Sequence, residues 1–277
     1  MELKRAKKCI QEAEILIITA GAGMGVDGGL PDFRGKEGFW RAYPPLKELG
    51  ISFEDLANPK SFRKNPELVW AFYAHRYKLY KNTPSHFGYE LLLRLAKQKK
   101  EYFIVTSNVD GHFLKAGFDK DRVYEYHGSI HYLQCAFYDC KNFVWENEDI
   151  IKINTKDFRA LSLPLCLRCR RLARPNIVMF EDYEFKDKRI NKQEAAFNKW
   201  KKKQINKKVA IIEIGAGKAV PSMRILGQNL CKKIPQSTLI RINPNEADFP
   251  KDFKEEKAIS LNMGGLEALG ELLGDLK

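Results

Sequence analysis

The stretch Ile15-Leu16-Ile17-Ile18-Thr19-Ala20-Gly21-Ala22-Gly23 decides the fold of this chain. Its first six residues form an apolar run that is far too short for a membrane helix and is typical of a buried strand. The glycines that follow predict a tight turn into a helix. In open α/β sheets such a turn binds phosphates on backbone amides. The same residues also suit a strand-to-helix turn without any ligand, so this motif alone leaves both interpretations open.

The rest of the chain alternates between strand and helix patterns. We expect further strands at 102–106, 122–125, 209–214 and 238–242, and helices at 2–12, 85–97 and 264–273. This alternation predicts an α/β protein with a Rossmann-like, doubly wound parallel sheet and a small inserted zinc-ribbon and helical domain. The predicted boundaries give the Rossmann-like domain residues 1–38, 85–130 and 181–277, the helical insert residues 39–84, and the zinc-ribbon insert residues 131–180.

Composition narrows the class of protein. Hydrophobic residues make up 44% of the 277 residues, enough for a sizeable core. The charged N-terminus has no signal-peptide core and no segment resembles a membrane span, so we expect a cytoplasmic protein without a membrane partner. The formal charge is +13, with lysines concentrated in residues 186–208. That run predicts one solvated helix face, which either contacts an acidic partner or is simply basic surface.

Four of the six cysteines form two pairs. Two pairs separated by 25 residues, with four and two residues between their members, fit a closed zinc ribbon. In an intracellular chain this pattern favours a metal over disulfides. The sequence therefore predicts one structural zinc ion, with chance clustering of free thiols as the alternative. The predicted ligands are Cys135, Cys140, Cys166 and Cys169.

Polar side chains follow two of the predicted strands. Asn108 and Asp110 come just after the second strand, and His127 follows the third. Ligands of open α/β sheets bind at that edge, where an amide and a carboxylate can hold a ribose or a nicotinamide carboxamide. An Asx turn at the strand end is the alternative. Histidine is suited to accept a proton near neutral pH, and we expect the other four histidines to be structural.

Taken together and in this order, the motifs resemble those of the sirtuin (Sir2-like) family, in a divergent bacterial-type form. The resemblance covers nearly the whole chain. It rests on the glycine turn, on the two cysteine pairs, and on Pro31-Asp32-Phe33-Arg34, Thr106-Ser107-Asn108-Val109-Asp110, His127-Gly128, Arg174-Pro175-Asn176-Ile177-Val178 and Arg241-Ile242-Asn243.

The resemblance implies a NAD-dependent protein lysine deacylase that acts on acyl-lysine proteins or peptides. In that reaction the acyl oxygen attacks the anomeric carbon of the nicotinamide ribose, and nicotinamide leaves. A histidine base then deprotonates a ribose hydroxyl, and the products are free lysine, nicotinamide and O-acyl-ADP-ribose. By resemblance His127 is the base. The implied NAD-binding residues are Gly21, Ala22, Gly23, Asp32, Phe33, Arg34, Ser107, Asn108, Asp110, Gly215 and Asn243.

The resemblance also implies a substrate side, formed by Tyr73, Arg76, Val178 and Phe180. A Tyr-x-x-Arg pair in this helical region marks family members that accept succinyl or malonyl lysine. The pair shares a helix face and suits a carboxylate. The alternative is a tyrosine packed in the core beside an arginine in a surface ion pair.

The chain departs from the family pattern at several positions, and the first of those named here lies in the segment that clamps the substrate peptide. Phe180-Glu181-Asp182 stands in place of Phe-Gly-Glu, Ser107 in place of Gln, and Gly25 in place of a serine. Two alternatives to deacylation therefore stay open. One is ADP-ribosyl transfer or NAD hydrolysis on the same scaffold. The other is a non-catalytic binding protein that uses the zinc ribbon and the basic helix.

Overall fold

A computed structural model describes residues 1–31, 36–148 and 150–276. Its centre is a six-stranded sheet in the order β11-β10-β9-β1-β2-β3, in which every pair of neighbours is parallel. The five predicted strands are confirmed with shifts of at most one residue, and the sixth was not anticipated. The strands are β1 (Ile15–Ala20), β2 (Glu101–Thr106), β3 (Val123–Glu125), β9 (Val209–Ile214), β10 (Ser237–Ile242) and β11 (Ala258–Leu261).

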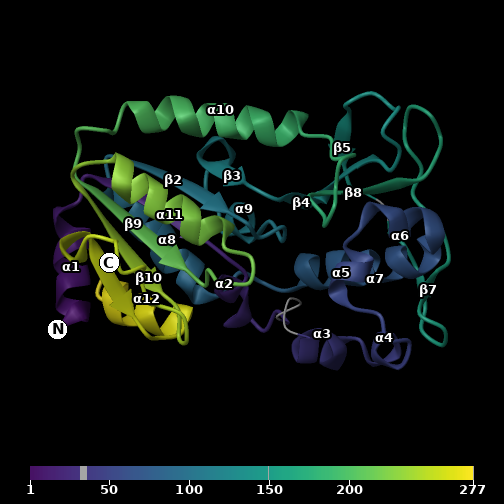
Figure 1. Ribbon diagram of the computed structural model, residues 1–277, viewed down its shortest axis with the longest axis horizontal. Coiled ribbons are helices and arrows are strands. Elements are labelled where there is room, and N and C mark those ends of the chain that lie inside the picture. Colours follow the sequence, from purple (N-terminus) through teal and green to yellow (C-terminus); the bar gives the residue numbers. More distant parts are fainter. Residues whose placement is uncertain (32–35, 149, 277) are drawn as a thin grey trace.

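Helices cover both faces of this sheet, as Figure 1 shows. Successive side chains of a strand point to opposite faces. Leu16 and Ile18 of β1 pack in one core, and Ile15 and Ile17 pack in another. The first core includes side chains of α1 (Glu2–Glu12), α8 (Phe87–Gln98) and α12 (Gly265–Leu273), and the second includes side chains of α10 (Lys188–Lys202) and α11 (Ser222–Lys233). The doubly wound α/β prediction is confirmed.

A third core joins the two predicted inserts, which are far apart in the sequence. Phe62, Trp70 and Phe72 of the helical segment share this core with Ile130 and Leu133 of the cysteine segment. We call this unit the small module; it lies beside the large sheet in Figure 1. Its helices are α3 (Lys36–Ala42), α4 (Pro44–Glu48), α5 (Phe53–Leu56), α6 (Pro59–Lys64) and α7 (Pro66–Asn82), and its strands are β4 (Gly128–Cys135), β5 (Val144–Glu146), β6 (Ile153–Asn154), β7 (Arg159–Ala160) and β8 (Ala173–Ile177).

Four short helical turns complete the described chain. The turn α2 (Gly23–Val26) follows β1, α9 (His112–Lys115) follows β2, η1 (Lys120–Arg122) precedes β3, and η2 (Glu255–Lys257) precedes β11. Among the helices of the described residues, none combines the length and the apolar character needed to span a bilayer.

The predicted solvated basic face is present on α10, where Lys188, Lys192 and Lys199 are exposed, but other residues of the 186–208 segment are buried. Phe197 and Trp200 of α10 are buried and pack against Phe103 of β2. Lys186 precedes the helix and is only 7% exposed. The buried face of the helix was hard to recognise in the sequence. It consists of two aromatic residues, three positions apart, which form a narrow apolar stripe among many lysines.

Candidate active site and metal centre

A cavity of about 210 Å³ lies between the carboxyl ends of β1, β2 and β3 and the small module. Nine of the predicted site residues line it: Ala22, Tyr73, Arg76, Ser107, Asn108, Asp110, His127, Val178 and Phe180. Sequence reasoning missed the other lining residues, which are Gly25, Leu30, Pro31, Phe53, Ala57, Tyr80, Val109, Ile177, Met179 and Val220. The cavity is therefore polar along the sheet edge and largely apolar along the module.

The glycine turn after β1 packs directly against the turn after β9. Gly21 donates to the carbonyl of Ile214 at 2.9 Å, and Gly23 donates to the carbonyl of Gly215 at 3.0 Å. A Cβ at Gly23 would lie 2.7 Å from the Cα of Gly215, so there is no room for a side chain at Gly23. These glycines are required for packing whether or not a phosphate binds. Gly21, Gly23, Gly215 and Asn243 are not among the residues that line the cavity, and Asn243 donates to the carbonyl of Ala216.

Asn108 and Asp110 are buried to more than nine tenths, yet both line the cavity. The amide of Asn108 donates to the carbonyl of Gly21 at 2.9 Å, which ties the segment after β2 to the glycine turn. Asp110 Oδ1 accepts from the backbone of His112 at 2.9 Å, so the Asx turn that was the alternative to a ligand site is present. The turn fixes this carboxylate at the cavity wall.

His127 lies half-buried in the turn between β3 and β4 and faces the same cavity. Its carbonyl accepts from Val178 at 2.9 Å, and its Nε2 lies 3.4 Å from the hydroxyl of Ser222 at the start of α11. Sequence reasoning missed Ser222 because only the folded sheet brings α11 to this turn. Each of the other four histidines has a structural hydrogen bond, as predicted: His75, His86, His112 and His131.

Tyr73 and Arg76 lie on one face of α7, and both line the cavity. Both are buried, and burial raises the pKa of Tyr73 to about 12. The guanidinium of Arg76 donates to the hydroxyl of Tyr80 at 2.7 Å and lies over the ring of Phe72. Arg76 is buried, so the alternative of an arginine on the surface is wrong, and its guanidinium lies beside the apolar wall of the cavity.

The predicted residues Asp32, Phe33 and Arg34 lie outside the residues that the structure describes. Val178 and Phe180 follow β8, and both are partly exposed at the cavity. The backbone of Phe180 donates to Ala57 at 2.9 Å, and Glu181 pairs with Lys60 at 2.8 Å. The segment after β8 is thus connected to the helices of the small module.

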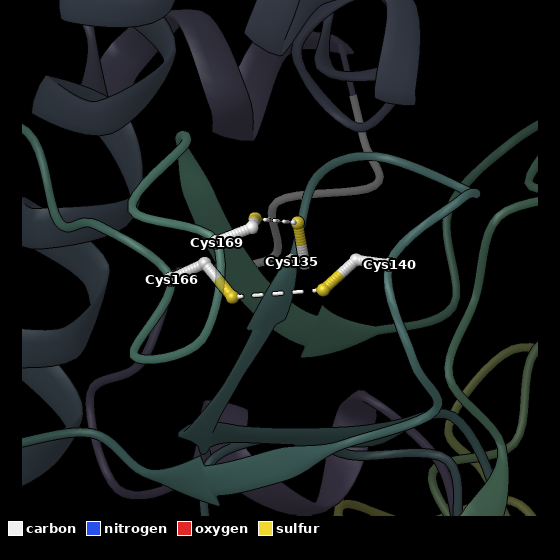
Figure 2. A group of neighbouring side chains, drawn as sticks. All are labelled: Cys135, Cys140, Cys166 and Cys169. Carbon is white, nitrogen blue, oxygen red and sulfur yellow. Dashed lines mark hydrogen bonds between the residues drawn. The ribbon is translucent and has the colours of Figure 1, made fainter.

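The four clustered cysteines meet at one point, as Figure 2 shows. Their sulfurs all lie within 4.8 Å of one another, with Cys135 to Cys169 at 3.5 Å and Cys140 to Cys166 at 3.9 Å. Four thiolates at about 2.3 Å from one zinc ion would be ~3.8 Å apart, so the residues fit a tetrahedral zinc site with no open position. All four are free thiols in this geometry.

Neighbouring groups favour the thiolate form of Cys169, whereas burial raises the pKa of the Cys135 and Cys140 thiols. The guanidinium of Arg171 lies 3.5 Å from the sulfur of Cys169 and lowers the pKa of that thiol to about 6. The backbone of Arg168 donates to the sulfur of Cys166 at 3.5 Å. Contacts of this kind, from residues that are not themselves ligands, orient the metal ligands and offset the negative charge of the cluster. The site is built to stabilise the small module.

The fold and the site define a Rossmann-like α/β protein with a metal-binding module inserted beside the nucleotide edge of its sheet. Residues 21–220 match the model of the Sir2 family. This chain belongs to that family.

Individual relatives give the same result. An NAD-dependent protein deacylase of Thermococcus sibiricus is 31% identical over 181 residues, and the chain spans 64% of that relative's length, just under two thirds. One of Leptospira interrogans is 30% identical over 231 residues, which cover 83% of this chain and 81% of the relative. A crystal structure of a Sir2 homologue in complex with NAD superimposes with a TM-score of 0.71 at 25% identity, covering 99% of this chain and 93% of the other.

Proposed function

We propose that the protein is a NAD-dependent protein lysine deacylase, in which NAD is a substrate that the reaction consumes. The observation that carries this proposal is the single cavity shared by Ala22, Asn108, Asp110 and His127 at the strand ends and by an apolar wall of the small module. One end suits a ribose and a carboxamide, and the other suits an acyl chain. The names of the similar proteins support the same assignment.

In this proposal each polar residue has one role. The buried Asn108 and Asp110 hold the ribose and the nicotinamide, because both are fixed by hydrogen bonds before any ligand enters. His127 removes the proton from a ribose hydroxyl, since its ring faces the cavity and its Nε2 can accept or relay a proton. The apolar module wall excludes water, which protects the electron-poor ribose carbon from hydrolysis. Gly21, Gly23, Gly215 and Asn243 shape the adjoining adenosine side, and Ser107 completes the segment after β2.

Substitution of the base tests the assignment. Wild-type protein with NAD and an acyl-lysine peptide is expected to release nicotinamide in step with free lysine. His127→Ala is expected to reduce that rate by about 10²-fold or more, because proton transfer of this kind contributes on that order. His75→Gln is the matched control, since His75 lies outside the cavity. Equal rates for wild type and His127→Ala would contradict the proposal.

The same assay separates deacylation from the two other activities. Nicotinamide released without any acyl peptide, together with free ADP-ribose, would indicate NAD hydrolysis. Transfer of the ADP-ribosyl group to protein would indicate ADP-ribosyl transfer. Binding to an acidic partner without turnover would favour a non-catalytic role.

An acidic acyl group is part of this proposal, because Arg76 is buried at the acyl end of the cavity beside two phenols. Arg76→Met should lower kcat/KM for a succinyl-lysine peptide by about 10-fold to 100-fold, as expected for a lost charge-assisted hydrogen bond. It should change kcat/KM for an acetyl-lysine peptide much less. A uniform loss on both peptides would indicate that Arg76 acts only in packing.

Two further points of the proposal concern the surroundings of the protein. Exposed lysines of the 186–208 segment, among them Lys188, Lys192, Lys199, Lys202 and Lys203, provide a basic surface for an acidic partner. Such binding would weaken steeply with salt.

Four free thiols gathered for a metal suit a reducing compartment, so the proposal includes a cytoplasmic location.

A further inference from the structure

Lys186 is a buried lysine next to the cysteine cluster, and the mechanism above does not use it. Its side chain is among the few lysine side chains enclosed by the fold, with 7% exposure for the residue. Its ammonium donates to the carbonyls of Tyr138 and Cys140 at 2.9 and 2.8 Å. Both carbonyls belong to the loop that carries the first cysteine pair. The ammonium therefore holds this loop from outside the ring of ligands.

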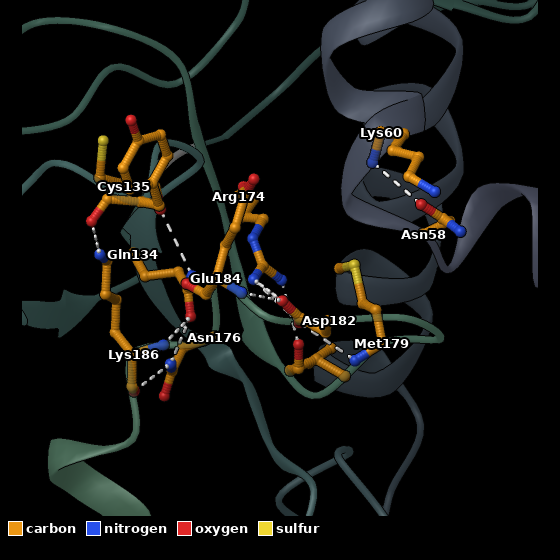
Figure 3. Close-up of polar contacts among 12 residues, drawn as sticks. Asn58, Lys60, Gln134, Cys135, Arg174, Asn176, Met179, Asp182, Glu184 and Lys186 are labelled. Atoms are coloured by element: carbon orange, nitrogen blue, oxygen red, sulfur yellow. Dashed lines mark hydrogen bonds and ion pairs between the residues drawn. The ribbon is translucent and has the colours of Figure 1, made fainter.

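The backbone of Lys186 is held in turn by Gln134, which directly precedes the ligand Cys135. The amide oxygen of Gln134 accepts from the backbone of Lys186 at 3.0 Å and from Asn176 at 2.9 Å. Its amide nitrogen donates to the carbonyl of Glu184 at 3.1 Å. Gln134 and Asn176 are fully buried, so each of these bonds replaces a lost contact with water. Figure 3 shows Gln134, Asn176, Glu184 and Lys186 with the hydrogen bonds among them.

The next segment of chain is the cleft loop, residues 178–184, which carries Val178 and Phe180 at the cavity. A single carboxylate, Asp182, holds its two ends. Asp182 accepts from the backbones of Met179 and Glu184 at 3.2 and 3.1 Å. Both of its oxygens also accept from Nη2 of Arg174, at 2.7 and 2.9 Å, and both side chains are buried. Buried pairs of this kind are costly to break. The cleft loop is thus a fixed piece rather than a loose connection.

The outer side of the cleft loop is bonded to the small module. Glu184 pairs with Arg63 of α6 at 2.8 Å, and the backbone of Phe180 donates to Ala57 at 2.9 Å. Asn108 takes no part in these two contacts, because it bonds to Gly21 and to Thr106. Val178, at the other end of the cleft loop, donates to the carbonyl of His127 at 2.9 Å. A displacement of residues 184–186 would therefore act first on Phe180 and Glu184, at the module side of the cavity, and leave the bonds of Asn108 in place.

We propose that Lys186 and Gln134 form a hydrogen-bonded link, here called the strut, that couples the metal site to the wall of the acyl-peptide cleft. This rests on the proposed function in naming the cleft. Four thiolates around one zinc ion carry a net charge of about −2, and the ammonium of Lys186 lies beside that charge. The metal holds the loop of Tyr138 and Cys140, the loop holds Lys186, and Lys186 with Gln134 holds Glu184 at the end of the cleft loop. Lys186 is a positioning residue for the substrate wall.

The test compares Lys186→Met with Lys188→Met, an exposed lysine two residues further on. The first readout is amide hydrogen exchange at Met179, Phe180 and Glu184, whose N–H groups are all bonded in the intact loop. In Lys186→Met these amides should exchange about 10-fold faster or more, because local opening becomes easier. Amides of β1 should keep their wild-type rates. The control variant should match wild type at every position.

The second readout separates the substrates. Lys186→Met should raise KM for the acyl peptide about 5-fold to 10-fold, whereas KM for NAD and kcat should stay within about twofold. Unchanged exchange of the cleft loop in folded Lys186→Met would overturn the proposal, and so would an equal rise of both KM values. If Lys186→Met does not fold, Gln134→Met cuts the same link, with the same exchange result expected. If wild-type protein lacks acyl-peptide activity, the proposed function fails while the exchange data still decide the strut.

Discussion

At the scale of single residues, the close contact between the two glycine turns determines whether the NAD side can form. Gly23→Ala would place a methyl group 2.7 Å from the Cα of Gly215. Backbone cannot move aside as a flexible side chain can, so we expect a loss of about 2–4 kcal/mol in the free energy of unfolding. Urea denaturation measures this loss.

A second glycine provides the control for that experiment. A methyl group on Gly270 in α12 would meet nothing within 4 Å. Gly270→Ala should therefore raise the free energy of unfolding, by up to about 1 kcal/mol, since alanine favours the helix. A Gly23→Ala variant as stable as Gly270→Ala would show that the two turns do not pack as described.

Ser222 is the residue-scale feature that sequence reasoning missed at the candidate base. Its hydroxyl lies 3.4 Å from Nε2 of His127, a long contact of the kind that tightens when substrate binds. Ser222→Ala should lower kcat/KM about 3-fold to 10-fold, through poorer orientation of the ring. Steady-state kinetics against Ser162→Ala, an exposed serine of the small module, measures the effect. Identical kinetics in the two variants would mean that Ser222 does not orient His127.

At the scale of elements, α7 contributes a pH dependence to folding. Burial lowers the pKa of His75 below its usual range, and the charge of Lys78 lowers it further. His75 accepts or donates a 2.9 Å hydrogen bond to the hydroxyl of Tyr43. Because the folded pKa is the lower one, the unfolded chain binds more protons below about pH 6.5. The stability from neutral His75 is present above that pH and is lost as the pH falls through it.

Urea denaturation at pH 7.5 and at pH 5.5 tests this sign. Wild-type protein should lose more free energy of unfolding between the two pH values than His75→Gln does, because glutamine does not titrate. A larger loss in His75→Gln than in wild type would refute the assigned direction.

Much of the large sheet could be predicted at this scale, since its signals are local. β1 and β9 are largely apolar runs, each followed by a glycine, and they begin and end where the sequence indicated. β11 was not anticipated because only two of its four residues are buried, so it has little apolar pattern. The domain boundaries placed at 38, 84, 130 and 180 remain predictions.

The candidate site was predictable only in part, for a related reason. Residues directly after a strand, such as Asn108 and His127, can be recognised because the sheet edge defines their place. Tyr80, Phe53 and Ala57 reach the cavity from the helical part of the small module. Lys186 is buried against the loop that contains Cys140 of the first cysteine pair. No local pattern indicates such contacts, because they exist only once distant segments pack together.

At the scale of the whole molecule, the separate cores predict separate responses to metal removal. The cysteine cluster lies at the edge of the small module, whose core contains Leu133 and Ala160, whereas β1 and β9 pack in two other cores. Chelation of the metal should expose amides of β4 and β8 to exchange, while those of β1 and β9 stay protected. Structural zinc contributes directly to folding free energy, so the module depends on it. Simultaneous loss of protection in all four strands would contradict this independence.

The central claim is that one cavity brings NAD and an acyl-lysine together, with His127 as the base. Mass analysis of the products formed from NAD and an acyl-lysine peptide tests it most directly. The account predicts one equivalent each of free-lysine peptide, nicotinamide and O-acyl-ADP-ribose from wild-type protein, and an about 10²-fold or greater loss in the rate at which His127→Ala forms free-lysine peptide and O-acyl-ADP-ribose. Free ADP-ribose formed at the same rate with and without the peptide would contradict it.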